Sequence, residues 1–339
     1  MKNLIVFNFA MDTNHSIFGH QADLVDNFCQ DYSNVFVLTQ QVGKYKKHQN
    51  LKVIDLNWKP GSNFKNSLNF QFKLLKLLRE NKIDIVFSHM TTISSLLGIF
   101  FTKFFKIKHY LWYAHASSSF YLRVLIPLLD GIISSTPGSF PFKSKKIRFI
   151  GQGIKSGAFK FSVKRDSNYK KFFHVGRLDP SKRIDELISF FLSIAKNKQM
   201  FFLIGSPSGN RVSTRYFTSI YSKYRTSSKI KFVGSVNRKE LPKLVKNYDC
   251  FLHLFQGSLD KSLVEATLMG IPILTVNREY LIEFGSWGKN LNPTLATEHQ
   301  ALLSKKPEDV RIELRKRAKL ARANHEFKSW YQKLIYIIS

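Results

Sequence analysis

Short apolar runs alternate with longer segments that carry apolar residues at helical spacing through the first 150 residues of the chain. The runs predict buried strands and the longer segments predict helices. The predicted strands are Leu4–Phe9, Val35–Thr39, Val53–Leu56, Ile83–Ser88, Tyr110–Ala114, Gly131–Ser134 and Ile147–Ile150, and the predicted helices are Gly19–Gln30, Ser67–Arg79 and Thr91–Phe105. Strands that alternate with helices of this length indicate parallel βαβ units.

The pattern restarts after a polar and basic segment at residues 155–170, where we place an interdomain linker. The next predicted strands are Phe172–Val175, Met200–Ile204, Lys231–Val233, Cys250–Leu254 and Pro272–Val276, with helices at Lys182–Ala195, Arg238–Lys246 and Lys261–Met269. A chain of 339 residues is too long for one typical core. We therefore expect two doubly wound, Rossmann-like α/β domains facing a central cleft. Their predicted bounds are 1–158 and 168–324, and a terminal helix at about 325–339 is able to pack back on the first domain.

Composition narrows the class of protein. The chain is 44% hydrophobic and 14% aromatic, which is typical of a well-packed globular protein. Its two cysteines, Cys29 and Cys250, lie in apolar runs in different halves, which argues against a disulfide framework and favours a reducing, cytoplasmic compartment. The run Leu4–Ala10 is short, contains Asn8 and lacks a cleavage pattern, so it predicts a strand rather than a signal peptide. No apolar run reaches the roughly 18–20 residues of a spanning helix.

The formal net charge is +30, and residues 101–165 hold twelve basic residues but only one acidic residue, Asp130. A field of this size favours polyanionic partners: an anionic membrane, a nucleic acid or a phosphorylated substrate. A compositional bias towards lysine is the alternative. No helix-turn-helix, zinc or aromatic RNA-binding motif is present, so we expect no nucleic-acid partner.

A first candidate motif runs from Gly176 to Lys182. Gly176 ends a predicted strand and allows a tight turn close to a ligand. Asp179-Pro180-Ser181 is typical of a helix start, whose free N–H groups attract phosphate. Arg177 and Lys182 flank this start and would add two cations. The alternative is an ordinary loop with two solvated cations.

A second candidate motif places Glu265 on a largely apolar helix that ends at Gly270-Ile271-Pro272. A buried carboxylate needs partners. Ribose hydroxyls would supply two donors; Lys182, Arg177 or a backbone N–H would be the structural alternative. Both motifs lie at the carboxyl ends of predicted strands, where open α/β sheets bind ligands. Two cations and one carboxylate there suit a diphosphate joined to a ribose.

Three segments together resemble a known family. "FFHVGRLDPSKRIDELI" at 172–188, "GSLDKSLVEATLMGIPIL" at 257–274 and "IRFIGQGI" at 147–154 are similar to signatures of retaining GT-B glycosyltransferases of family 4. The resemblance implies that Arg177 and Lys182 bind the donor diphosphate and that Glu265 binds the donor ribose. It further implies that Gly19 lies near the donor phosphates, that Val236 lies at the nucleobase and that His115 faces the transferred sugar.

One position departs from the family. Its first glutamate lies eight residues before the second, and here that position is Gly257. Asp260 is the candidate replacement, with helix capping as the alternative, and Lys261 adds a cation within reach of the phosphates. His20 and His89 are secondary site candidates, whereas His174 lies inside a predicted strand and is expected to be structural. No residues have metal-ligand spacing, so we expect no obligatory metal or other cofactor.

Two predicted helices bear on membrane binding. In Leu68–Glu80 the polar stripe favours a helix that covers the sheet. In Ile93–Lys108 a narrow polar stripe adjoins Phe100, Phe101, Phe104 and Phe105. Two interpretations of this helix stay open: an interfacial membrane anchor and a helix that covers the sheet.

The sequence thus predicts a retaining, hexosyltransferase-type glycosyltransferase of cell-envelope polysaccharide biosynthesis. It would use a UDP- or GDP-sugar donor and a glycan or lipid-linked acceptor, in the cytoplasm or peripherally on the inner membrane face. A sugar phosphorylase or synthase on the same fold is one alternative. A catalytically silent relative acting as a binding subunit is the other, and Gly257 supports it.

Overall fold

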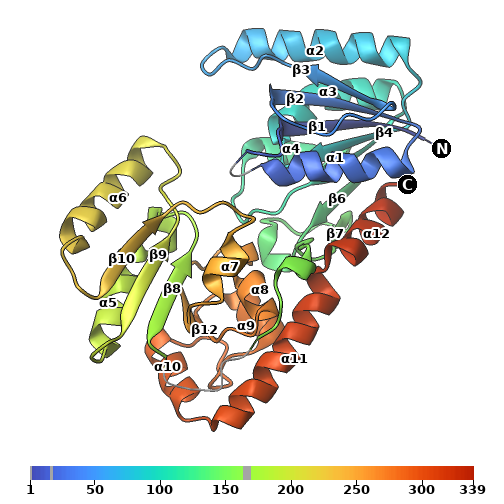
Figure 1. The fold of residues 1–339 in the computed structure, drawn as a ribbon. Helices are drawn as coiled ribbons and strands as arrows, with labels where there is room; N and C mark the ends of the chain where they lie inside the picture. Colours follow the sequence, from blue (N-terminus) through green and yellow to red (C-terminus); the bar gives the residue numbers. More distant parts are fainter. Residues whose placement is uncertain (1, 16–17, 163–168) are drawn as a thin grey trace. The chain divides into compact units, whose positions relative to one another are not determined.

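The computed structural model describes residues 2–15, 18–162 and 169–339. The chain divides into two compact units, and each is described by itself (Figure 1). Unit 1 is Met1–Ile150 with Gln332–Ser339, and unit 2 is Gly151–Tyr331. The division therefore falls a few residues before the predicted linker at 155–170, of which residues 163–168 lie outside the described residues.

Unit 1 is built on a seven-stranded sheet with the order β3-β2-β1-β4-β5-β6-β7 among the described residues, and each neighbouring pair is parallel. Its strands are β1 (Asn3–Met11), β2 (Asn34–Val42), β3 (Leu51–Asp55), β4 (Ile85–His89), β5 (Lys108–Trp112), β6 (Gly131–Ser134) and β7 (Ile147–Phe149). Its helices are α1 (Gly19–Asp31), α2 (Asn63–Glu80), α3 (Thr92–Phe104) and α4 (Phe120–Leu128). The central strand β1 is almost wholly buried, which explains its continuous apolar run.

Unit 2 has a five-stranded sheet with the order β10-β9-β8-β11-β12, again parallel between neighbours. Its strands are β8 (Lys171–Val175), β9 (Met200–Ile204), β10 (Ile230–Gly234), β11 (Cys250–His253) and β12 (Ile273–Thr275). Its helices are α5 (Ile184–Ile194), α6 (Arg211–Tyr224), α7 (Leu241–Val245), α8 (Lys261–Leu268), α9 (Arg278–Phe284), α10 (Leu295–Leu303) and α11 (Pro307–His325). The last helix, α12 (Phe327–Ile338), begins in unit 2 and ends in unit 1. Among the described residues, one apolar cluster packs around Phe172 and another around Phe173, whose side chains point to opposite faces of β8.

Two local expectations need correction. Lys182 does not open a long α-helix: Pro180–Lys182 forms a 3₁₀ turn, and α5 begins at Ile184 because Arg183 adopts the left-handed conformation, with φ of 52°. The helix expected at Arg238–Lys246 is shortened to α7, which starts at Leu241 beside Pro242. Helices α4 and α6 were not predicted; Ser119 and Asn210 cap their first turns.

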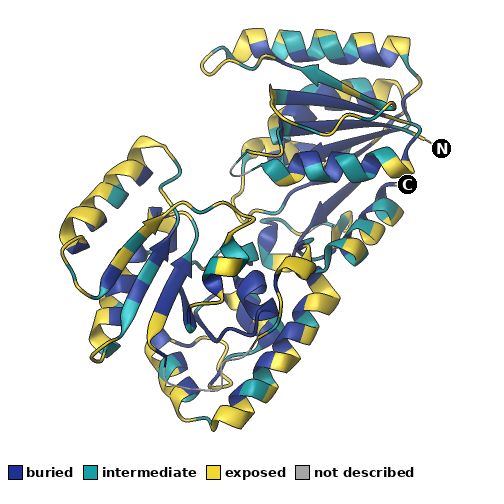
Figure 2. Cartoon of the chain, in the orientation of Figure 1, coloured by how far each residue is buried: buried dark blue, intermediate teal, exposed yellow. Residues whose placement is uncertain are grey.

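Helix α2 carries apolar residues on a buried and on an exposed side, and Figure 2 shows buried and exposed positions alternating along it. Phe70, Leu74 and Leu77 are buried in the cluster that contains Phe7 of β1, which fits the expected sheet-covering role. Phe64, Leu68 and Phe72 lie four residues apart on the other side and are exposed. Within the described residues no helix is both long and apolar enough to cross a membrane.

Candidate functional site

Three glycines mark the carboxyl ends of neighbouring strands in unit 2. Gly176 follows β8, Gly205 follows β9 and Gly234 ends β10. Gly205 has φ of +140°, and a Cβ there would lie 1.9 Å from the carbonyl oxygen of Gly176. Only glycine fits this close approach of two backbones. The carboxyl ends of these strands therefore present bare backbone, at the place where open α/β sheets bind ligands. We call this part of the sheet, formed by Gly176, Gly205 and Gly234, the glycine edge.

Arg177 extends from this edge into solvent. Its side chain is 51% exposed, and its Nη1 lies 3.5 Å from Oδ2 of Asp179. Asp179 is buried and accepts a hydrogen bond of 3.0 Å from the backbone N–H of Ser208 with its other oxygen. The carboxylate therefore anchors the loop after β9, and most of the guanidinium stays available to an anion.

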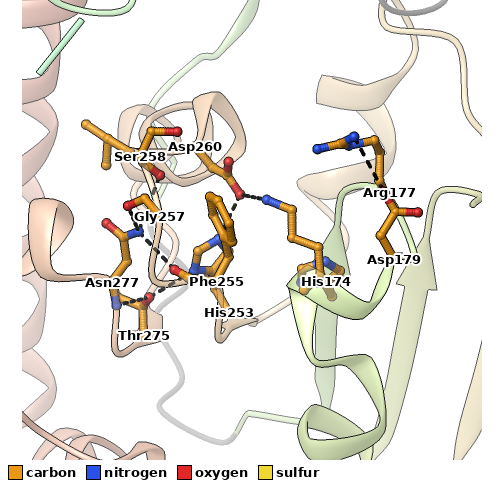
Figure 3. A network of polar contacts seen from close by, with 12 residues as sticks. His174, Arg177, Asp179, His253, Phe255, Gly257, Ser258, Asp260, Thr275 and Asn277 are labelled. Carbon is orange, nitrogen blue, oxygen red and sulfur yellow. Dashed lines mark hydrogen bonds and ion pairs between the residues drawn. The ribbon is translucent and has the colours of Figure 1, made fainter. Parts of the chain in front are cut away.

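Lys182, by contrast, is buried. Its ammonium donates to Oδ2 of Asp260, and the same oxygen accepts from Nε2 of His253 at 2.9 Å. Nδ1 of His253 bonds Thr275 at 3.0 Å. This completes a chain of four side chains that runs from the turn after β8, through the residue before α8, to β11 and β12; Asp260, His253 and Thr275 are labelled in Figure 3. We call Lys182, Asp260, His253 and Thr275 the lysine cluster. The alternative of a solvated Lys182 is wrong.

The charges in the lysine cluster support one another. Burial lowers the pKa of Lys182, and Asp260 offsets part of that change. Burial alone would raise the pKa of Asp260, but the hydrogen bonds and charges of His253 and Lys182 hold that pKa well below its usual range. Asp260 is thus an ionised partner of Lys182. Although it stands at the N-cap of α8, its side chain makes no capping hydrogen bond among the described residues, so the capping alternative is wrong.

The other predicted carboxylate has a partner that the sequence did not reveal. Glu265, on α8, is buried and accepts from Nη2 of Arg238, whose side chain is 61% exposed. Burial raises the pKa of Glu265, while Arg238 and Lys261 oppose the change. Burial and Arg238 lower the pKa of Lys261 to about 8. We call these three residues the glutamate cluster; neither Lys182 nor Arg177, the partners expected from sequence, bonds Glu265 here.

Two comparisons identify this arrangement. Residues 156–302, which include β8 to β12 and both clusters, match the model of the family described as glycosyl transferases group 1. This part of the chain is similar to that family, which confirms the resemblance to a group 1 glycosyltransferase seen in the sequence. Family 4 and the retaining mechanism stay predictions. No curated protein gives a significant match to the sequence.

Solved structures match almost the whole chain. Anabaena HepE, in complex with UDP and glucose, has a TM-score of 0.74 at 14% identity, with 99% of each chain covered. Sucrose-phosphate synthase from Thermosynechococcus elongatus has a TM-score of 0.78 at 13% identity, with 99% of this chain and 98% of that chain covered. The lipopolysaccharide outer core galactosyltransferase WaaB, in its apo form, has a TM-score of 0.71 at 13% identity, with 100% and 99% covered. The predicted GT-B fold class is confirmed.

Gly257 stands where the resemblance seen in the sequence implies a glutamate, and the structure shows what fills the space. A Cβ at Gly257 would lie 2.2 Å from the tip of the Phe255 ring. The ring face also covers Lys182, whose Nζ lies 3.6 Å from the ring centroid. Figure 3 shows Phe255, Gly257 and Asp260 grouped around this point. Sequence reasoning missed Phe255 because nothing in the local pattern tells which way its ring turns.

The remaining candidates lie apart from the two clusters. Val236 follows β10, is half-buried and packs against the apolar cluster around Phe173. Gly19 opens α1 in unit 1, and a Cβ there would lie 2.9 Å from the carbonyl oxygen of Thr13. His115 follows β5 in unit 1, and its Nδ1 accepts from the backbone N–H of Ser117 at 3.0 Å. Their roles at a donor stay predictions.

Three histidines complete the comparison with the sequence. Unit 1 brings His20 and His89 together, with ring centroids 5.4 Å apart in an edge-on arrangement. His174 is buried in β8 and donates from Nδ1 to the carbonyl oxygen of Leu252 at 2.9 Å, which agrees with its expected structural role. Burial lowers the pKa of His174 to about 3. Among the described residues no three metal-ligating side chains gather, and the independence from metal stays a prediction.

A cavity of about 560 Å³ lies at the opposite, amino end of the unit 2 strands. Its lining is largely apolar and includes Tyr248, Ile271 and Leu314, with Lys243 and Arg311 among its basic residues. Ser162 and Tyr169, which border the residues that the structure does not describe, also line it. Because the cavity lies at the other end of the strands from Arg177 and the two clusters, we do not assign it to the glycosyltransferase site.

Proposed function

We propose that the chain is a retaining glycosyltransferase that transfers a hexose-type sugar from a nucleoside diphosphate sugar to a glycan or lipid-linked acceptor. The observation that carries this proposal is the glycine edge of the unit 2 sheet, with the exposed guanidinium of Arg177 after β8 and the buried carboxylate of Glu265 after the adjacent strand β11. The bound UDP and glucose in HepE support UDP over GDP as the nucleotide. WaaB, a lipopolysaccharide galactosyltransferase, supports an acceptor in the cell envelope.

In this proposal the residues have separate tasks. Arg177 neutralises the diphosphate as it leaves, because a guanidinium forks onto two phosphate oxygens. The glycine edge lets the backbone approach the phosphates. Glu265 accepts hydrogen bonds from the two ribose hydroxyls, and Arg238, which is exposed, moves aside. His115 faces the transferred sugar, and neither a metal ion nor another cofactor is required.

Nucleotide binding tests the donor site. Glu265→Gln should weaken UDP binding about tenfold or more, because an amide cannot accept two hydroxyl donors as a carboxylate does. Calorimetry with UDP and GDP measures the loss, and Glu240→Gln, an exposed glutamate before α7, is the matched control. Unchanged affinity in Glu265→Gln would contradict the ribose assignment. A large loss of stability with normal affinity would assign Glu265 a structural role instead.

A specific observation supports a second candidate function, that of a catalytically silent relative acting as a binding subunit. Position 257 lacks the expected carboxylate, and Lys182 is paired with Asp260 and covered by Phe255. Tight UDP binding without transfer from any donor sugar would favour a binding subunit. Turnover that falls more than nucleotide affinity in Asp260→Asn would favour the enzyme, with Asp260 replacing the missing glutamate.

We also propose that unit 1 meets an anionic membrane surface on the cytoplasmic side. Helix α3 packs against both α2 and α4. These helices expose a set of aromatic side chains that we call the aromatic surface: Phe64 and Phe72 on α2, Phe100 and Phe104 on α3, and Phe120 on α4. Phe101, which the sequence grouped with them, packs against the cluster that contains Phe7 instead. Exposed lysines such as Lys65 and Lys103 accompany the rings, which suits lipid headgroups above acyl chains.

Vesicle flotation tests this surface. The protein should bind vesicles rich in acidic lipid, and binding should weaken as salt rises, because the Debye length falls to about 8 Å at physiological ionic strength. The triple variant Phe64→Ser, Phe72→Ser, Phe104→Ser should lose binding. Ile282→Ser, Leu303→Ser, Ile312→Ser changes three exposed apolar residues of unit 2 and should keep it. Equal binding by both variants, or stronger binding to duplex DNA than to vesicles, would contradict the proposal.

A further inference from the structure

The Lys182 ammonium is enclosed on two sides. Asp260 accepts its hydrogen bond, and the face of the Phe255 ring lies 3.6 Å from Nζ, within the range of a cation–π contact. Only 6% of the lysine side chain is exposed. A phosphate oxygen cannot reach this ammonium in the observed arrangement, although the resemblance assigns Lys182 to the donor diphosphate.

The ring occupies space that only a glycine at position 257 leaves open. Its tip and the two adjacent ring carbons would lie 2.2–2.8 Å from a Cβ at Gly257. A side chain at position 257 and the observed orientation of the Phe255 ring therefore exclude each other. The glutamate missing from the family pattern and the covered lysine are two aspects of the same packing.

The backbone around the ring is fixed. The buried Asn277 side chain donates from Nδ2 to the carbonyl oxygens of Phe255 and Gly257, at 2.9 and 3.2 Å. Its Oδ1 accepts from the N–H of Tyr280 at the start of α9. The loop is thus tied to a helix, and rotation of the half-buried Phe255 side chain is the movement left to uncover Lys182.

We propose that Phe255 is a positioning residue that shields Lys182: its ring holds the ammonium against Asp260, and a nucleoside diphosphate engages Lys182 only when the ring turns away. The inference rests on the proposed donor site, since it names how that site opens. Gly257 is required for this shielding, because any larger residue at position 257 would displace the Phe255 ring.

Acylation of Lys182 tests the shield without any nucleotide. The full-length protein is treated with an amine-reactive ester at about pH 8, and the modified peptide is followed by mass spectrometry. Phe255→Ala and Gly257→Ala should each raise the rate at Lys182 about tenfold, the factor expected when a desolvated cation–π contact is lost. Gly257→Ala retains the ring and only displaces it, so it remains informative if Phe255→Ala fails to fold. The control is Phe190→Ala, which removes a half-buried ring of α5 that packs beside His299. It should leave the acylation rate at Lys182 unchanged.

UDP affinity, measured on the same variants, separates this inference from the proposed function. Tighter UDP binding in Phe255→Ala and Gly257→Ala, together with faster acylation, would support both. Faster acylation without UDP or GDP binding in any variant would support the shield and overturn the donor assignment. An acylation rate that stays at the wild-type value in both variants would overturn the shield, whether or not UDP binds.

Discussion

The lysine cluster and the glutamate cluster lie on neighbouring elements of unit 2, and they bury opposite partners. In the first the cation, Lys182, is enclosed, whereas its carboxylate partner Asp260 retains some exposure. In the second the carboxylate, Glu265, is enclosed, whereas Arg238 extends into solvent. An exposed partner can leave at little cost when a ligand arrives, but an enclosed one cannot. The glutamate cluster is therefore suited to exchange Arg238 for ribose hydroxyls. In the lysine cluster the more exposed partner, Asp260, is also held by His253, and the Phe255 ring covers Lys182, so this pair stays together until the ring turns.

The two clusters also respond to pH in opposite directions. The pKa of Asp260 is lowered by folding, so its contribution to stability is present above the unfolded value of 3.8 and is lost as pH falls through the folded value. The pKa of Glu265 is raised by burial above 4.5, so the folded chain holds a proton that the unfolded chain has released. The free energy of unfolding therefore falls as pH rises through that window.

The largest expected effect comes from breaking the enclosed pair. Asp260→Asn should lower the free energy of unfolding by about 3 kcal/mol, because the Lys182 charge is left buried without its carboxylate. Urea unfolding at neutral pH measures the loss. The loss should persist down to about pH 5, because the low pKa of Asp260 keeps the wild-type pair ionised there.

The double variant Lys182→Met, Asp260→Asn is the control for this prediction. It removes both charges and fills the lysine volume with an apolar chain, so most of the lost stability should return. If the double variant is as unstable as the single one, the loss arises from the hydrogen bond to His253 rather than from the buried charge.

A smaller effect is expected at the glutamate cluster. Arg238→Gln should lower the free energy of unfolding by about 1 kcal/mol at neutral pH, because its exposed guanidinium is partly screened by water. Without Arg238 the pKa of Glu265 should rise further. The loss should shrink as pH falls towards 4.5, the unfolded value, because the folded carboxyl, whose pKa lies above that value, is then largely protonated and no longer pairs with Arg238. Urea unfolding at several pH values measures this, with Lys239→Gln as the control. A loss that does not depend on pH would contradict the assigned ion pair.

Local sequence signals predicted most of the fold. The apolar runs located the strands of the described residues within a few positions. The signal is clearest for central strands such as β1 and β4, which are buried on both faces. Gly176, Arg177, Lys182 and Glu265 were singled out because they follow strands or lie on an apolar helix, and their roles at a donor stay predictions. Helices α4 and α6 were missed, and the left-handed Arg183 displaced the predicted start of α5.

The partners within the site could not be predicted, because they are set by packing between distant segments. Lys182 and Asp260 are 78 residues apart in the sequence, and Arg238 and Glu265 are 27 apart. Both bonds depend on which loops the parallel sheet brings to one edge. The Phe255 ring over Gly257 is likewise a rotamer choice, for which the sequence pattern holds no signal.

The smallest effect on stability is expected at Arg177, which belongs to neither cluster. Its guanidinium is half-exposed and only 3.5 Å from Asp179, so Arg177→Ala should change the free energy of unfolding by less than about 0.5 kcal/mol. If Arg177 has its proposed role, the same variant should lower kcat/KM for the donor by about 2–4 kcal/mol of transition-state stabilisation, because the charge proposed to stabilise the leaving diphosphate is removed. Arg183→Ala removes a neighbouring exposed arginine that pairs with Glu186 and should keep its activity. Wild-type turnover in Arg177→Ala would mean that the diphosphate is bound elsewhere, and the lysine cluster would then be the cation site to test next.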